Sequence, residues 1–409
     1  MKLLNSILYL LVTFLFIIFS WNCSEEPIEN DLSNVNLKID TLLIEDISAN
    51  PYWIAPNLGL TDYLYVGRTT YLHSDYTFIS FSNNQYNWGA FLDSNITSFD
   101  SLIFIINIRD SLTNPPSLWY SADSQFSESK STYLDFSEDI ESGMSFIGEP
   151  DTILFKEDIT DNDTLKHFFY TEIRWDIMDL FDAITDTIDT NIVRTFILTP
   201  GSNDSTILKI FSREGLANYG PKIRTVHRVT QTSNDSVMTD TIKGLLLASS
   251  DKTIYEPIDL VKDSSNIGIG SGVGHQFIMS INFDSLSLPD RALIRESILT
   301  LPLDTTTIID KFRVYINPLE EGVDTSSLFF EEDPYSGVGF PYMVNNLTEN
   351  GILEIEFVKK YLQNISLGNE TNLGFKVFAS PLNDPFDFIR FNLNNINNPP
   401  SLKILYVTN

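Results

Sequence analysis

The sequence contains one unit twice, so the chain is expected to build two similar structures. When the two halves are aligned, Leu42 matches Leu245 and Gly67 matches Gly270. The matches continue to the end of the chain: Ser101 with Ser297, Phe136 with Phe330, Ile173 with Ile355, Phe211 with Phe391 and Pro221 with Pro400. The offset between matched residues only decreases along the chain, and its largest step predicts an insertion at residues 147–172.

Short apolar or alternating runs, separated by turn-forming residues, make up both copies. They include LYVG, TFISF, SLIFIINI, ILEIEF and LKILYV, and such runs are typical of β-strands. Only residues 177–184 and 358–365 have a helical pattern. We therefore predict an all-β fold of two tandem jelly-roll-like β-sandwich domains. Their expected bounds are 41–229 and 242–409, joined by a polar linker at 230–241.

The first residues of the chain resemble a bacterial lipoprotein signal peptide. Lys2 precedes the apolar stretch LLNSILYLLVTFLFIIFS, and the single cysteine, Cys23, follows closely. The resemblance implies that residues 1–22 are removed and that acyl chains on Cys23 anchor the protein to the outer membrane. An uncleaved membrane anchor is the alternative, since about 18 apolar residues approach the length of a membrane-spanning helix. Residues 23–40 are polar and acidic, as expected of a tether at the cell surface.

The charge of the chain limits its partners. It has 26 Lys and Arg against 55 Asp and Glu, a formal net charge of −29. Such a charge repels the phosphates that a nucleic-acid-binding protein must neutralise, which excludes nucleic acid as a partner. The presence of one cysteine excludes an intramolecular disulfide, a redox-active cysteine pair and a zinc site with several cysteines.

The order of motifs within each copy resembles the DNRLRE family and carbohydrate-binding module family 96. Each copy opens with a glycine-containing strand, continues through a strand of the FISF type and closes with a strand that follows a proline. The stretch DRALIRE, from Asp290 to Glu296, lies where the stretch that names the DNRLRE family lies. The resemblance implies β-sandwich domains of bacterial surface proteins that bind extracellular polysaccharide.

The sequence contains no recognisable catalytic motif. It has no Gly-x-Ser-x-Gly elbow, no His-Glu-x-x-His pair and no phosphate-binding loop that ends in Gly-Lys-Ser or Gly-Lys-Thr. We therefore predict that the protein is not an enzyme.

One acidic motif, Phe-x-Glu-Asp-x-x-Ser-Gly-x-x-Phe, recurs in both copies. Its carboxylates are Glu138 and Asp139 in the first copy and Glu332 and Asp333 in the second. Acidic loops supply the oxygen ligands of calcium, so calcium is a candidate cofactor at these residues. The alternative is a plain turn in which the glycine adopts a positive φ and the phenylalanines pack beneath it.

Aromatic side chains are the candidates for binding the apolar faces of sugar rings. Trp53 and Trp88 are expected to be exposed in the first domain, and Tyr335 and Tyr342 lie near predicted loops in the second. Trp175 belongs to an alternating strand and is expected in the core.

His73 and His275 occupy the same place in the two copies, each eight residues before a phenylalanine on the same face of the strand. A partly buried histidine bonded to the backbone is the plain interpretation, and a ligand contact is the alternative. The sequence as a whole predicts a lipid-anchored, non-enzymatic surface protein that binds polysaccharide or other cell-envelope components. The rival interpretation is a structural or adhesive protein that binds no sugar.

Overall fold

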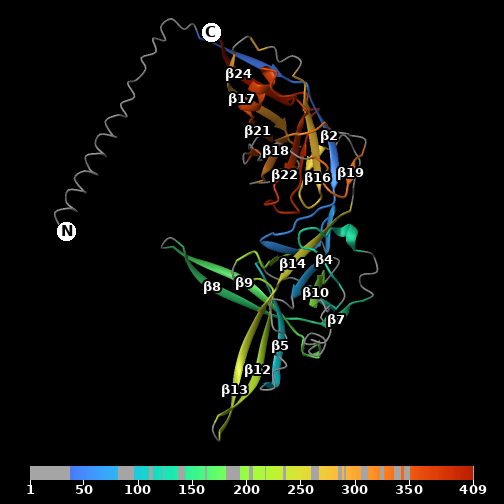
Figure 1. The fold of residues 1–409 in the computed structure, drawn as a ribbon, viewed down its shortest axis with the longest axis vertical. Coiled ribbons are helices and arrows are strands. Elements are labelled where there is room, and N and C mark those ends of the chain that lie inside the picture. The colour runs from blue at the N-terminus through green and yellow to red at the C-terminus, as the bar shows by residue number, and fades with distance from the viewer. Residues whose placement is uncertain are drawn as a thin grey trace, which may run out of the picture.

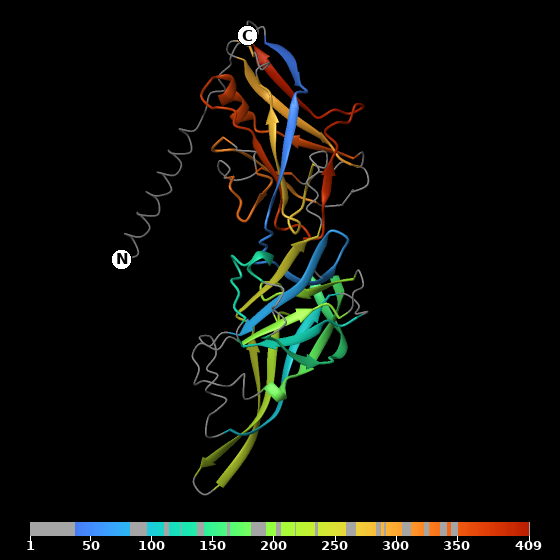
Figure 2. The same ribbon diagram turned by 90° about the vertical axis from the view of Figure 1, so that its right-hand side faces the viewer.

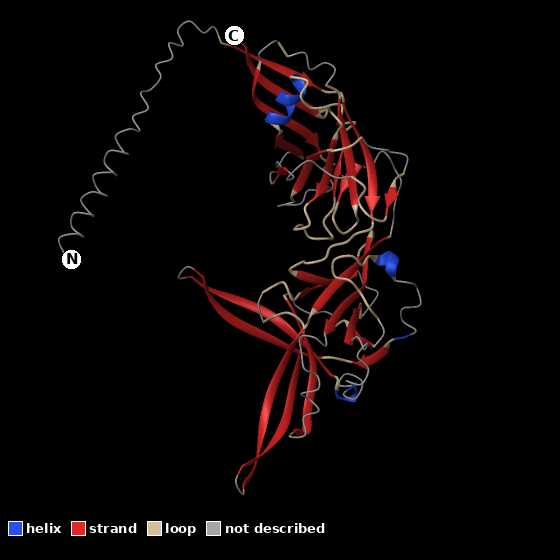
Figure 3. Cartoon of the chain, viewed as in Figure 1, coloured by secondary structure: helices blue, strands red, loops and turns tan. Residues whose placement is uncertain are grey.

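The computed structural model describes most of the chain from Leu37 onward. The described residues are 37–81, 96–109, 114–122, 124–136, 143–161, 164–180, 194–201, 206–216, 218–233, 236–258, 267–283, 288–289, 292–304, 312–322, 327–335, 342–344 and 351–408. Strands dominate this part, and the predicted all-β class is confirmed (Figure 3). Two lobes follow one another along the long axis of the molecule (Figures 1 and 2).

The first lobe is built on one sheet of twelve strands. The strands are β3 (Tyr63–Arg68), β4 (Leu72–Phe81), β5 (Ile96–Ile108), β6 (Ser117–Ser121), β7 (Ser145–Gly148), β8 (Asp151–Asp161), β9 (Thr164–Asp176), β10 (Arg194–Thr199), β11 (Ile207–Phe211), β12 (Lys222–Ser233), β13 (Ser236–Leu247) and β14 (Ser250–Pro257). Two 3₁₀-helices, η3 (Tyr133–Asp135) and η5 (Met178–Leu180), accompany them. Strands from distant parts of the sheet share one core, in which Phe104 of β5 stacks on Phe196 of β10. Trp175 lies in this core at 1% exposure, as predicted.

The second lobe is a β-sandwich. One sheet contains β1 (Lys38–Ile44), β24 (Ser401–Thr408), β17 (Leu293–Pro302) and β21 (Ile352–Glu356). The other contains β19 (Phe329–Phe330), β2 (Ile47–Ile54), β16 (His275–Ile281), β22 (Phe375–Ala379), β18 (Val314–Pro318) and β20 (Tyr342–Val344). A short pair, β15 (Ile267–Ile269) and β23 (Ile389–Phe391), and the helix α3 (Lys359–Ser366) complete the lobe.

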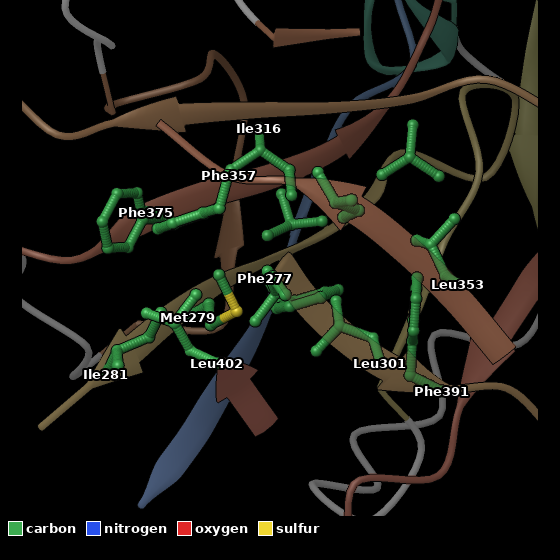
Figure 4. Packing of buried hydrophobic residues seen from close by; sticks show 14 of the residues in the cluster. Phe277, Met279, Ile281, Leu301, Ile316, Leu353, Phe357, Phe375, Phe391 and Leu402 are labelled. Carbon is green, nitrogen blue, oxygen red and sulfur yellow. The ribbon is translucent and has the colours of Figure 1, made fainter. Parts of the chain in front are cut away.

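Alternation along the strands buries one face of each sheet against the other. Phe277 and Met279 point inward from β16, and Leu301 and Leu353 meet them from β17 and β21 (Figure 4). All four side chains are 0% exposed. The helix α3 covers residues 359–366, which confirms the helical pattern predicted at 358–365.

The strand pairings confirm the internal repeat. Those of the first lobe recur in the second as follows: β3 with β11 as β15 with β23, β4 with β10 as β16 with β22, β5 with β9 as β17 with β21, β5 with β12 as β17 with β24, β6 with β7 as β18 with β20, and β6 with β10 as β18 with β22. The strand β8 has no such counterpart among the described strands. It lies within the predicted insertion and forms a hairpin with β9, which extends four residues beyond it. The finer expectation of a jelly-roll stays a prediction.

The two copies exchange their first two strands, which corrects the predicted domain bounds. Strands β1 and β2 belong to the first copy, but they pair with β24 and β16 of the second lobe. Strands β13 and β14 belong to the second copy, but they pair with β12 and β4 of the first lobe. The repeated unit therefore does not coincide with a lobe, because each lobe takes its first two strands from the other copy.

The predicted linker at 230–241 is wrong for the same reason. Strands β12 and β13 pair without interruption from Lys222 opposite Leu247 to Ser233 opposite Ser236. The polar residues of this region are thus the outer part of a long hairpin, which points away from the second lobe (Figures 1 and 2). A run of Thr, Asn, Asp and Ser suits a solvated hairpin as well as a linker, so composition alone misleads here.

Candidate functional site

A cavity of about 470 Å³ lies where the two lobes meet. Its first-lobe wall consists of residues 57–63 and Tyr65 with Ser129 and Lys209, and its second-lobe wall is the loop at 381–385. Residues 55–62 carry the chain from β2 of the second lobe to β3 of the first. Pockets of this size at a junction of two lobes are the usual binding sites for small ligands. The exchange of strands creates this one, because the crossing segment forms part of its wall.

Lys209 and Asp384 form an ion pair across the junction. Lys209 lies on β11 directly opposite Tyr65 on β3, and its Nζ is 3.1 Å from Oδ2 of Asp384. The same Nζ lies 4.6 Å from the centre of the Tyr63 ring and 5.4 Å from that of Tyr65. The Tyr65 hydroxyl donates to Oδ2 of Asp384 at 3.2 Å. The ammonium group is therefore held by a carboxylate and by two ring faces, an arrangement that fixes its position.

Two leucines widen the apolar part of the cavity. Leu60 and Leu382 line it from opposite lobes, and each is 70% exposed. Leucines with this exposure on both sides of one cavity provide apolar surface that a ligand would remove from water.

Some polar groups of the cavity wall are already hydrogen-bonded within the protein, and others are open to a ligand. The Asn57 amide donates to the Ser129 carbonyl at 2.8 Å, and the Asn383 amide exchanges two hydrogen bonds with the backbone of Arg313. Asp62 is exposed, and none of the described residues pairs with its carboxylate. The charged groups that a ligand would meet are those of Asp62, Lys209 and Asp384.

Aromatic packing holds the two lobes together behind the cavity. Tyr65 contacts Tyr255 and Phe386 with ring centres 6.3 and 5.5 Å apart. The Tyr71 hydroxyl donates to the Phe386 carbonyl at 2.6 Å. Burial, together with the neighbouring Asp384 carboxylate, raises the pKa of Asp387 to about 6. The contacts of Tyr65 and Tyr71 with Phe386 fix the geometry of the cavity walls.

Three carboxylates converge elsewhere in the first lobe. Oxygen atoms of Glu128, Glu214 and Asp251 lie within 4.8 Å of one another. The backbone N–H of Arg213 donates to Asp251 at 2.7 Å, and its guanidinium contacts Glu128 and Glu214. The cluster offers the oxygen ligands that Ca²⁺ requires, and Arg213 already supplies part of the opposing charge.

The prediction that Trp53 is an exposed ligand contact is wrong. Its side chain is 2% exposed, and it lies directly opposite His275 of β16. Its indole N–H donates to Nε2 of His275, and the two rings meet edge to face at 5.1 Å. The partner of His275 is therefore a buried side chain, whereas His73 is partly exposed beside Asp75.

The predicted residues of the second copy do not lie in the cavity. Tyr335 packs edge-on against Tyr52 and Phe330. The Asp333 carboxylate accepts hydrogen bonds from Lys376 and from the Tyr335 backbone N–H, as a turn residue would. Two further predicted residues are placed elsewhere: Glu332 is exposed and Tyr342 begins β20. The predicted Cys23, Trp88, Glu138 and Asp139 lie outside the described residues.

The cavity residues were not predicted from the sequence. Lys209 and Asp384 are 175 residues apart and share no motif, so no local pattern connects them. The only local signal is the alternation of Tyr63 and Tyr65, which places both side chains on one face of β3.

Comparisons with protein-family models, with curated proteins and with solved structures gave no match. The resemblance to the DNRLRE family stays a prediction. In the described part of the chain, no helix is long and apolar enough to cross a bilayer.

Proposed function

We propose that the protein is a non-enzymatic, lipid-anchored envelope protein that binds polysaccharide in the cavity between its lobes. The observation that carries the proposal is the Tyr63 ring beside the Lys209 and Asp384 ion pair in an open cavity. Sugar rings present apolar C–H faces and a rim of hydroxyl groups. A site for them needs aromatic or aliphatic surface next to fixed hydrogen-bonding groups.

The cavity walls provide both kinds of contact. Tyr63, Leu60 and Leu382 supply apolar surface, and carboxylates accept charge-assisted hydrogen bonds from hydroxyl groups. The cavity wall carries two carboxylates, those of Asp62 and Asp384, and one ammonium group, that of Lys209. The net charge facing the ligand is therefore negative. Together with the net charge of −29, this disfavours uronic acids and sulfated sugars and favours neutral glycans.

The anchor belongs to the same proposal. Acyl chains on Cys23 would hold the protein at the outer membrane, and residues 24–36 would connect them to β1, which begins at Lys38. Calcium is not needed for the proposed contacts in the cavity. A chelator is therefore expected to leave glycan binding unchanged.

A glycan array probed with residues 24–409, which contain every described strand, tests the proposal. We expect a hit among neutral glycans, and binding that falls several-fold in Tyr63→Ala because stacking contacts contribute about 0.5–1.5 kcal/mol beyond area burial. Tyr133→Ala is the matched control, since Tyr133 is a partly exposed tyrosine of the same lobe that does not line the cavity. Absence of any hit, or equal loss in both variants at unchanged melting temperature, would count against the cavity as a glycan site.

A structural role is the second candidate. The exchange of strands ties the lobes into one elongated body (Figure 2), which suits a spacer at the cell surface. This role predicts no glycan binding and a large loss of stiffness when the contacts between the lobes are cut.

A further inference from the structure

Strand β13 presents a free edge. It pairs with β12 along its whole length and stands last in the order of the twelve-stranded sheet. No described strand pairs with its other side. Unpaired backbone groups along a strand of this length are a template for another strand. In Figure 1 the hairpin of β12 and β13 extends from the body of the lobe.

The side chains of this strand are unusually apolar for an exposed edge. Five of them expose between 41% and 69% of their surface: Val237, Met238, Ile242, Leu245 and Leu247. Isolated exposed leucines are common, but β13 has apolar side chains at both ends of a free edge, on either side of the polar stretch 239–241, and such an edge is a candidate association site.

The pattern along β13 is complementary to itself. In an antiparallel pair related by a two-fold axis, opposite residues lie equally far from the axis and on the same face. With the axis at Ile242, Val237 lies opposite Leu247 of the partner subunit, and Met238 lies opposite Leu246 of the partner subunit. The apolar residues at one end of β13 therefore lie opposite the apolar residues at the other end of the partner strand.

The charged residues also fit this register. Lys243 lies opposite Thr241 of the partner subunit, and Asp240 lies opposite Gly244 of the partner subunit, so no like charges face each other directly. A lysine on a free edge discourages random pairing. In this register it meets a threonine, which can accept its hydrogen bond.

The outer face of the hairpin is cationic, because Lys222, Arg224 and Arg228 on β12 share it with Lys243 on β13. The described side chains of this hairpin face include no carboxylate, and Arg228 pairs with Asp100 of β5. In the two-fold pair the cationic faces of both copies lie side by side, so the pairing rests on apolar contacts and backbone hydrogen bonds, while salt screens the repulsion between the cations.

We propose that β13 is the interface between two copies of this chain. The two β13 strands pair antiparallel about a two-fold axis near Ile242, and the two twelve-stranded sheets become one continuous sheet. A closed, isologous dimer of this kind uses the same patch on both copies and leaves none free to bind a third copy. The proposal does not depend on glycan binding.

Strand β1 provides the matched control. It is the corresponding edge of the second lobe, and it is seven residues long against the twelve of β13. Leu43 of β1 is 54% exposed and Leu247 of β13 is 46% exposed. The variants Leu43→Lys and Leu247→Lys therefore make the same chemical change on equivalent edges.

Sedimentation equilibrium of residues 24–409 measures the dimer. We expect a dimer in the unaltered chain and no change in Leu43→Lys. In Leu247→Lys, which places an ammonium group opposite Val237 of the partner subunit, we expect a dissociation constant raised about tenfold or more. A monomer at all accessible concentrations would overturn the proposal. So would a dimer that survives Leu247→Lys, or one that Leu43→Lys dissociates instead.

Cross-linking tests the register. The chain has no cysteine after Cys23, so an added cysteine in residues 24–409 reports only on its own position. Opposite residues in antiparallel strands have Cα atoms about 4.5–5.5 Å apart, within the range of a disulfide. Ile242→Cys is expected to link two copies on mild oxidation, whereas Val237→Cys alone does not, and Val237→Cys with Leu247→Cys does. Efficient linking by Val237→Cys alone would contradict an axis near Ile242.

Discussion

Trp53 and His275 face each other on neighbouring strands of the second lobe, although 222 residues separate them in the chain. The pair joins β2 of the first copy to β16 of the second. In the first lobe the corresponding pair is Glu256 and His73, which joins β14 of the second copy to β4 of the first. The same cross-strand position is thus filled twice, each time by residues from both copies.

This exchange predicts that the two repeats cannot be separated at the boundary between copies. Residues 242–409 alone lack β1 and β2, so the edges of β24 and β16 lose their partners and part of the core becomes exposed. We expect this fragment to unfold or aggregate. Residues 55–258 contain all twelve strands of the first lobe and are expected to fold alone.

A rescue experiment distinguishes the exchange from general instability. Residues 38–54, joined by a flexible linker to residues 267–409, restore both missing strands and are expected to give a cooperative thermal transition by circular dichroism. A cooperative transition in the unrescued 242–409 fragment would contradict the strand exchange.

The sequence could predict the class of fold and the repeat, because alternation and turn residues act locally. It could not predict the exchange. The pattern of apolar residues in β1 is compatible with pairing to β12 as well as to β24. Only the tertiary structure shows which of the two strands β1 pairs with. Trp53 illustrates the same point, since its neighbours Tyr52 and Pro56 look like a loop margin and yet its ring is buried against His275 of β16.

The candidate site was less predictable than the fold. Its ion pair and its tyrosines come from β3, β11 and a loop of the second lobe, which meet only because the chain crosses between lobes. The acidic motif at Asp333 was visible in the sequence, but its carboxylate binds Lys376, which lies on β22, 43 residues further along the chain.

His275 is expected to make the protein sensitive to acid. Burial lowers the pKa of His275 to about 3 from an ordinary value of 6.5, and its Nε2 accepts the Trp53 indole hydrogen bond only when the ring is neutral. The unfolded chain takes up a proton near pH 6.5 and the folded chain does not. This contribution to stability is present above pH 6.5 and is lost as the pH falls toward 3.

Urea unfolding between pH 7 and 4 measures the effect. Because Asp251 titrates with the opposite effect over this range, the His275 contribution is the difference between the unaltered chain and His275→Gln. From pH 7 to 4 we expect the unaltered chain to lose roughly a few kcal/mol relative to His275→Gln, at about 1.4 kcal/mol for each unit of pKa shift. It should lose none relative to His73→Gln, at a partly exposed position. Identical slopes in His275→Gln and the unaltered chain would refute the assignment.

Gly67 is expected to tolerate no side chain. Its φ is +145°, and a Cβ at this position would collide with the backbone of Thr206 and Ile207 on the strand paired with it. Gly67→Ala should therefore cost more than about 2 kcal/mol in the free energy of unfolding. Gly322→Ala is the control, because no atom lies within 4 Å of its added Cβ, and its change should stay within about 0.5 kcal/mol. Equal changes in the two variants would show that the backbone at Gly67 can relax.

Asp251 is expected to weaken the protein as the pH rises. Burial raises its pKa to about 8 from an ordinary value of 3.8, with Glu214 and Glu128 adding to the shift. The folded chain keeps a proton there that the unfolded chain releases. Its contribution to stability is therefore fully present below pH 4 and is lost as the pH rises through 8.

Asp251→Asn removes the ionisation and keeps the oxygen that accepts the Arg213 backbone hydrogen bond. We expect the variant to match the unaltered chain near pH 4 and to exceed it by roughly a few kcal/mol at pH 8. Measurements stop at pH 8 because burial lowers the pKa of Lys252 to about 8, which introduces an opposite slope above that value. Asp62→Asn, at an exposed carboxylate, should leave the profile unchanged. If Asp251→Asn and the unaltered chain lose stability in parallel between pH 5 and 8, then burial and the neighbouring carboxylates do not raise the pKa of Asp251 as expected.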